Sequence, residues 1–229
     1  MRKNPWGLVF LAVLAVNLVS IAAGNDNLQF ISKCLLMPPL MLYAWTGFGK
    51  TRQLLPLLIL ALVFSWGGDI ILLFQADKEI FFMLGLGSFL LAHIFYIILF
   101  HKIRVAENIP SKALFLLIVV LYYGGLMVFL NPWLGPMKIP VSVYGIVISF
   151  MFMLSMHLLY MGNKKAGLWI MAGALLFVLS DSTLAVNRFY KPFEQAGLVI
   201  MLTYGLAQFA IVYGVIQYVQ SLKSNDPAQ

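Results

Sequence analysis

Eight apolar segments, most of them close to the length that spans a bilayer, follow one another along the chain with only short connections between them. Inside lipid the backbone has no water to bond with, so a segment that crosses the bilayer must satisfy its hydrogen bonds internally, as a helix. The sequence therefore predicts an all-α fold, a polytopic membrane protein built as a bundle of about eight transmembrane helices. The approximate limits of the segments are 7–23, 28–46, 54–74, 80–101, 113–130, 139–161, 166–186 and 195–219.

The composition excludes an ordinary soluble domain. Hydrophobic residues make up 62% of the chain and charged residues only 10%, whereas soluble domains carry about 25% charged residues. Arg2 and Lys3 ahead of the first segment resemble the start of a secretory signal. Because seven more segments follow, a first transmembrane helix is the simpler interpretation.

The connections between the segments are too short to hold a soluble domain. We therefore expect a single transmembrane helical domain over residues 1–222, followed by a disordered cytoplasmic tail over residues 223–229. The single cysteine, Cys34, excludes an intramolecular disulfide and says nothing about the redox compartment.

The basic residues predict the orientation in the membrane. Ten Lys and Arg residues lie on the side of the N-terminus, four lie on the opposite side, and Lys33 lies within a segment. Because cytoplasmic loops carry the excess of Lys and Arg, both termini are predicted to be cytoplasmic. Scattered over short loops, the formal net charge of +7 does not indicate nucleic-acid binding. The bias fits a bacterial inner membrane and does not exclude a eukaryotic internal membrane.

Two aspartates, Asp69 and Asp181, lie inside apolar segments. A carboxylate at the centre of a membrane helix costs about 2.5–3.5 kcal/mol on insertion scales. Both lie roughly five residues, about 7–8 Å, from the predicted outer ends of their helices. We therefore expect them to face one another across a cavity near the outer surface. The alternative is that each only bonds to polar neighbours and fixes helix packing.

Lys33 lies at the same predicted depth and is a candidate counter-ion for one of the aspartates. Burial favours the protonated form of a carboxyl group, and a nearby cation favours the ionised form. One aspartate would then stay protonated while the other stays ionised, which is the separation that a general acid and a general base require.

Several other polar side chains are candidates for lining or supporting this site. Ser65 and Ser180 have no histidine at helical spacing, so a serine hydrolase is not indicated. His93 either lines the cavity or bridges helices, and Arg188 either anchors the interface or binds a phosphate head group. The absence of a cysteine cluster and of paired histidines argues against a zinc site. The full set of supporting candidates is Lys33, Ser65, His93, Tyr96, Ser180, Asn187, Arg188, Tyr204 and Gln208.

Three stretches give the chain a resemblance to a known family. They are Phe64–Leu73 (FSWGGDIILL), Phe82–Tyr96 with its His93, and Phe177–Ser182 (FVLSDS). The chain resembles the YhhN-like family of integral membrane proteins, whose characterised members are lysoplasmalogenases. The similarity runs from the second segment to the eighth. One departure is Cys34, where the family pattern leads us to expect a proline, and this puts the local bend there in doubt.

The resemblance implies hydrolysis of the vinyl ether bond of a lysoplasmalogen, giving a fatty aldehyde and glycerophosphoethanolamine or glycerophosphocholine. The family's two intramembrane acids correspond to Asp69 and Asp181. A lysophospholipid is the implied substrate, with the bilayer as its source, and no metal or organic cofactor is required. Our hypothesis is that Asp69, close to Lys33, is ionised and that Asp181 is the acid.

Two other classes of function stay open on the residues alone. Intramembrane acids also suit a proton- or cation-coupled small-molecule transporter, and a non-catalytic lipid-binding or scaffold protein is a third alternative. Broken helices would favour transport, and the Gly67–Gly68 pair is the only candidate break that the sequence offers. The sequence does not predict the head-group preference, the chain-length preference or the oligomeric state.

Overall fold

The computed structural model describes residues 4–49, 52–75 and 78–224, and within these ranges every regular element is a helix. Six helices in the described part of the chain are long and apolar enough to cross a membrane, so the chain is a multi-pass integral membrane protein, and the predicted all-α bundle is confirmed. The α-helices are α1 (Trp6–Ala22), α2 (Asp26–Cys34), α3 (Met37–Phe48), α4 (Leu55–Leu72), α5 (Glu79–Ala106), α6 (Ala113–Leu130), α7 (Lys138–His157), α8 (Lys164–Ala185) and α9 (Ala196–Ser224).

Short helical turns extend or connect some of these elements. Two 3-10 turns, η1 (Asn131–Trp133) and η2 (Gly135–Met137), link α6 to α7. A third 3-10 turn, η3 (Leu158–Tyr160), follows α7, and a π-helical turn, η4 (Val186–Tyr190), continues α8. Most predicted segments correspond to one helix each, although α5 runs to Ala106, past its predicted end at residue 101.

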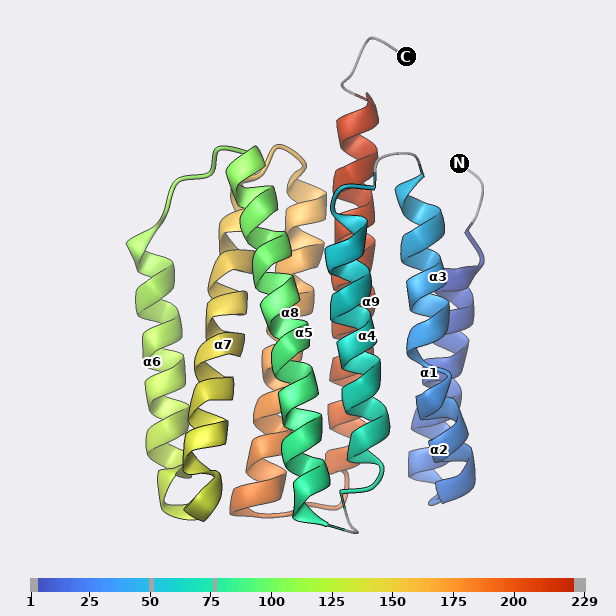
Figure 1. Ribbon diagram of the computed structural model, residues 1–229, viewed down its shortest axis with the longest axis vertical. Helices are drawn as coiled ribbons and strands as arrows, with labels where there is room; N and C mark the ends of the chain where they lie inside the picture. Colours follow the sequence, from blue (N-terminus) through green and yellow to red (C-terminus); the bar gives the residue numbers. More distant parts are fainter. Residues whose placement is uncertain (1–3, 50–51, 76–77, 225–229) are drawn as a thin grey trace.

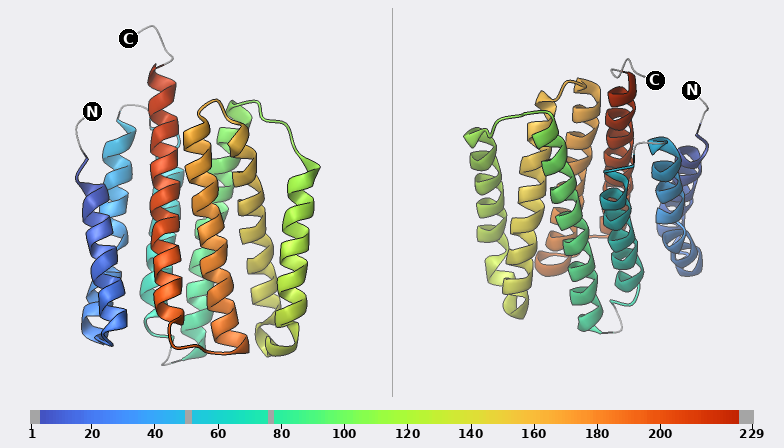
Figure 2. Two further views of the ribbon diagram at one scale, coloured as in Figure 1. Left: turned by 180° about the vertical axis from the view of Figure 1, so that it is seen from behind. Right: turned by 45° about the horizontal axis from the view of Figure 1, so that its top comes forward.

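The helices run side by side in one bundle (Figure 1), with α1–α3 at one edge and α6 at the other. Seen from behind, α9 lies between α8 and the α1–α3 group (Figure 2), and it contacts α1, α3 and α8. The start of α1 and the end of α9 lie at the same end of the bundle. This fits the even number of crossings that we predicted, whereas the cytoplasmic location of that end stays a prediction. The helix α9 includes residues 223 and 224, which we had assigned to the tail, and residues 225–229 lie outside the described ranges.

The second predicted segment is broken into two helices, α2 and α3, at Leu35 and Leu36. Pro38 and Pro39 cause the break, because proline has no N–H to donate to the carbonyl four residues earlier. The carbonyl of Cys34, which Pro38 leaves without its usual helical partner, accepts a hydrogen bond of 2.7 Å from Trp66 Nε1 of α4. The bend is therefore present although residue 34 is not a proline.

Gly67–Gly68, the candidate break that the transporter alternative offered, does not interrupt its helix, because both glycines lie within the continuous helix α4. Gly68 instead allows α4 and α5 to approach closely: a Cβ atom there would lie 2.6 Å from the ring of Phe89. Gly173 has the same role between α8 and α9, where a Cβ atom would lie 2.8 Å from the carbonyl oxygen of Ala207. Small residues at these positions pack each helical hairpin tightly.

The orientation can be tested with topology reporters fused after Pro132 and after Asp226. We expect the fusion at Pro132 to report the outer side and the fusion at Asp226 the cytoplasm, because the basic residues concentrate at the end where α9 finishes. The pair is self-controlled, since the three helices between the two sites, α7, α8 and α9, place them on opposite sides. A reporter at residue 226 found outside would overturn the orientation.

Candidate functional site

A polar cavity of about 180 Å³ lies at the end of the bundle opposite the start of α1 and the end of α9. The helices α1, α4 and α8 end on this side, and α2, α5 and α9 begin there. Six residues predicted for the site line the cavity together, and Gln29 and Gln75 line it with them. The six are Lys33, Asp69, Ser180, Asp181, Asn187 and Tyr204.

Asp69 lies three residues before the end of α4 and is only 2% exposed. Its Oδ2 atom accepts a hydrogen bond of 2.7 Å from the hydroxyl of Tyr204 in α9. Lys33 lines the cavity from the end of α2. Both belong to the described part of the chain, and no direct ion pair joins Lys33 to Asp69, so the lysine charge acts on this carboxyl across the cavity.

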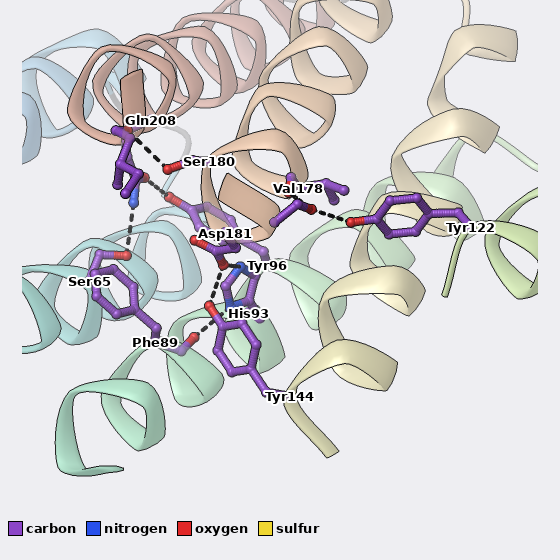
Figure 3. A network of polar contacts seen from close by, with 12 residues as sticks. Ser65, Phe89, His93, Tyr96, Tyr122, Tyr144, Val178, Ser180, Asp181 and Gln208 are labelled. Carbon is purple, nitrogen blue, oxygen red and sulfur yellow. Dashed lines mark hydrogen bonds and ion pairs between the residues drawn. The ribbon is translucent and has the colours of Figure 1, made fainter. Parts of the chain in front are cut away.

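Asp181 lies four residues before the end of α8, and its side chain is 16% exposed. Its Oδ2 atom accepts a hydrogen bond from the hydroxyl of Tyr144 in α7 and lies 3.9 Å from Nε2 of His93 in α5. Figure 3 shows Tyr144 and His93 beside this carboxyl group. Within the described residues Oδ1 has no hydrogen-bond partner, so one carboxyl oxygen is held and the other is free.

His93 is fully buried, and its two ring nitrogens have different surroundings. Nδ1 lies 2.7 Å from the carbonyl oxygen of Phe89, and a carbonyl only accepts, so Nδ1 carries a hydrogen. Nε2 has no hydrogen-bond partner among the described residues. In a neutral ring its lone pair faces Asp181, an arrangement that suits a protonated carboxyl better than an ionised one.

Three of the predicted residues form a buried chain of hydrogen bonds one helical turn farther from the cavity end of the bundle than the Asp69–Tyr204 pair. Gln208 donates to Ser65 over 2.9 Å and accepts from the hydroxyl of Tyr96 (Figure 3). All three side chains are fully buried, and they come from α9, α4 and α5. They do not line the cavity. They connect the three helices that carry Tyr204, Asp69 and His93.

The remaining predicted residues lie near the connection between α8 and α9. Ser180 Oγ donates to the carbonyl of Ile200 over 3.0 Å, which links α8 to α9. Asn187 lies in the π-helical turn, lines the cavity, and accepts a hydrogen bond of 3.1 Å from the backbone N–H of Phe193. Arg188 is exposed, with its guanidinium carbon 5.0 Å from the centre of the Phe82 ring. Arg188 is therefore not among the residues that line the cavity.

Sequence reasoning missed Tyr144, which is the only described donor to Asp181. It lies five residues after the predicted outer end of its segment at residue 139, the same depth as the two aspartates. The depth argument that selected Lys33 would have found it, but its ring was counted as part of an apolar run. Gln29 and Gln75 were also missed, because both lie at segment ends where polar residues are common.

Histidine, cysteine and acidic side chains do not cluster elsewhere in a way that suggests a metal centre. Over residues 4–49, 52–75 and 78–224, no three of them stand close enough together to hold a metal ion. The polar side chains that line the cavity supply two carboxyl groups, a lysine, a tyrosine hydroxyl, a serine hydroxyl and side-chain amides.

Comparisons with known proteins point to one family. The YhhN family pattern matches residues 28–215. A human protein named lysoplasmalogenase TMEM86B is 34% identical over 160 residues, covering 69% of this chain and 62% of the relative. A Mycobacterium bovis protein named lysoplasmalogenase is 29% identical over 213 residues, covering 90% of this chain and 78% of the relative. Bovine lysoplasmalogenase TMEM86A is 30% identical over 178 residues, covering 75% of this chain and 70% of the relative.

The extent of these matches differs between relatives. The alignment spans 62% of the length of the human protein and 54% of a porcine protein of the same name. No solved structure matches the chain at a significant level.

Proposed function

The chain belongs to the YhhN family, and from this membership we propose that it is a lysoplasmalogenase. It would cleave the vinyl ether bond of a lysoplasmalogen, giving a fatty aldehyde and a glycerophospho-alcohol. The relatives named above support this activity. The observation that carries the proposal is that Asp69 and Asp181, from different helices, line one cavity inside a membrane bundle.

Asp181 is proposed to be the general acid. Cleavage begins when a proton is added to the vinyl carbon that is not bonded to oxygen, and this leaves an oxocarbenium ion. Tyr144 already donates to Oδ2 of Asp181, so a proton on this carboxyl belongs on Oδ1, the oxygen without a partner. The unpartnered Nε2 of His93 beside the carboxyl favours the protonated form. The proton is thereby kept on the side that substrate can reach.

Asp69 is proposed to be the ionised partner. Its charge is stabilised by the hydroxyl of Tyr204 and, across the cavity, by Lys33. A carboxylate there would stabilise the oxocarbenium ion and take a proton from the attacking water, as in glycosidases, which pass through a similar cation. Water adds to the carbon bonded to oxygen, and the hemiacetal then collapses to the aldehyde and the alcohol. Neither step needs a metal or an organic cofactor.

The polar end of the cavity suits a lysophospholipid head group. Lys33 provides a cation, and Gln29, Gln75 and Asn187 provide amides that donate to and accept from phosphate and glycerol oxygens.

The transporter alternative predicted broken helices, and α2–α3 is a broken pair that carries Lys33. That break is accounted for by Pro38 and by the hydrogen bond from Trp66 to Cys34. The relatives reported above are named as lysoplasmalogenases, and transport is therefore not proposed.

The activity can be tested on protein purified in detergent, supplied with a lysoplasmalogen and followed by aldehyde release. Asp69→Asn and Asp181→Asn should each lower kcat by about 100-fold or more, because general acid–base catalysis contributes about 10²–10⁴-fold. Asp26→Asn is the matched control, since Asp26 is exposed in the first turn of α2. An inactive wild-type protein, or full activity in both variants, would remove the basis for the proposal.

The assignment of Asp69 as the ionised partner predicts a pH effect of Lys33→Ala. Without the cation the ionised carboxyl is less favourable, so the acidic limb of the pH–rate profile should move to higher pH by about 1 unit. Lys191→Ala removes an exposed lysine outside the cavity and should leave the limb in place. If Lys33→Ala leaves the acidic limb unchanged, Lys33 does not stabilise the base.

A further inference from the structure

An apolar groove runs between α6 and α8 in the same half of the bundle as the polar cavity, with α7 as its floor. Leu126 of α6, Ile148 and Ser149 of α7, and Val178 of α8 are among the residues that line it. Asp181 lines it too, and so does Tyr144, which donates to Asp181. The groove and the polar cavity therefore meet at the Asp181 carboxyl group.

This junction divides the surroundings of Asp181 by polarity. On one side lie Lys33, Asp69 and the amides of the cavity, and on the other lie the aliphatic and aromatic walls of the groove. An amphiphile whose polar head occupies the cavity would therefore pass Asp181 at the point where its hydrocarbon chain begins. In a lysoplasmalogen the vinyl ether bond lies at that point.

We propose that the groove between α6 and α8 is the binding site for the hydrocarbon chain of the lipid substrate, an inference that rests on the proposed hydrolase function. The chain runs from Asp181 toward Ser149 and leaves the protein into the bilayer. Tyr144 and Ser149 are five residues apart on α7, about 7–8 Å along the helix. Only the part of the chain nearest the reacting bond is therefore held by protein.

The position of α6 fits a wall that the bilayer can reach. Only Phe115, Val119 and Leu130 are buried in this helix, and most of its other large side chains are exposed. The hydroxyl groups of Tyr122 in α6 and Ser182 in α8 share a hydrogen bond, and Figure 3 shows Tyr122 pointing toward α8. This bond joins the two walls of the groove.

Ser149 offers a sharp test, because its hydroxyl is buried and has no partner among the described residues. Replacing it with phenylalanine narrows the groove without breaking a described hydrogen bond. The probes are two vinyl ether lysophospholipids with the same head group and either a hexenyl or a hexadecenyl chain. We expect Ser149→Phe to lower kcat/KM for the hexadecenyl substrate by about tenfold while leaving the hexenyl substrate within about twofold of wild type.

Ile146→Phe is the matched control, because Ile146 lies on α7 outside the groove and is 55% exposed. It should leave the ratio of the two kcat/KM values unchanged. Leu126→Trp narrows the groove from α6 and should shift the ratio in the same direction as Ser149→Phe. If Ser149→Phe does not fold, Leu126→Trp alone tests whether the groove binds the hydrocarbon chain.

An unchanged ratio, or an equal loss on both substrates, would overturn the groove as the chain site. A shift caused by Leu86→Trp but not by the groove variants would also overturn it. Leu86 lines a smaller apolar pocket that reaches Asp181 from the side of α5.

A binding measurement distinguishes failure of the hydrolase proposal from failure of the groove proposal. If wild type cleaves neither substrate, the same variants are compared for binding of hexyl and hexadecyl ether analogues, which have no vinyl group to hydrolyse. Selective weakening of hexadecyl binding would support the groove, and equal binding by wild type and variants would overturn it.

Discussion

The structure depends on keeping two carboxyl groups inside a membrane, where each costs several kcal/mol unless it is protonated, bonded or paired. Each aspartate has a tyrosine hydroxyl as donor: Tyr204 for Asp69 and Tyr144 for Asp181. Each also has a face on the same polar cavity, which Lys33 shares. A helix-packing role would be served by bonding alone. Two carboxyl groups that also line a common cavity can in addition react with a molecule bound in that cavity.

The way the helices pack makes this pairing part of the fold. Asp69 lies in α4 but is bonded from α9, whereas Asp181 lies in α8, is bonded from α7 and is faced by His93 of α5. The buried chain of hydrogen bonds through Gln208 joins α4, α5 and α9 one helical turn farther from the cavity. The close contacts at Gly68 and Gly173 hold each hairpin together. The groove between α6 and α8 then places apolar side chains beside the Asp181 carboxyl, on the side away from the polar cavity.

The fold and the two acids could be predicted from the sequence because both follow from hydrophobicity and the cost of charge in lipid. Depth along the helices also placed Lys33 correctly at the cavity. The bend at Leu35 was in doubt from the sequence because it depends on Pro38 and Pro39, not on residue 34, and on Trp66 of another helix, which donates to the freed carbonyl. Arg188 lies outside the cavity because the chain continues as a π-helical turn, in which Asn187 lines the cavity and Arg188 is exposed; a role as an interface anchor stays a prediction. The groove depends on how three helices pack, and no local pattern shows it.

In this account Asp69 and Asp181 act as one acid–base unit, and a double-mutant cycle on lysoplasmalogen hydrolysis tests this most directly. The rates of Asp69→Asn, Asp181→Asn and the double variant would be compared with wild type. If the pair is one unit, removing either member already disables it, so the double variant should be no slower than the slower single variant. Losses that multiply in the double variant would show that the two aspartates act independently, and would contradict the account.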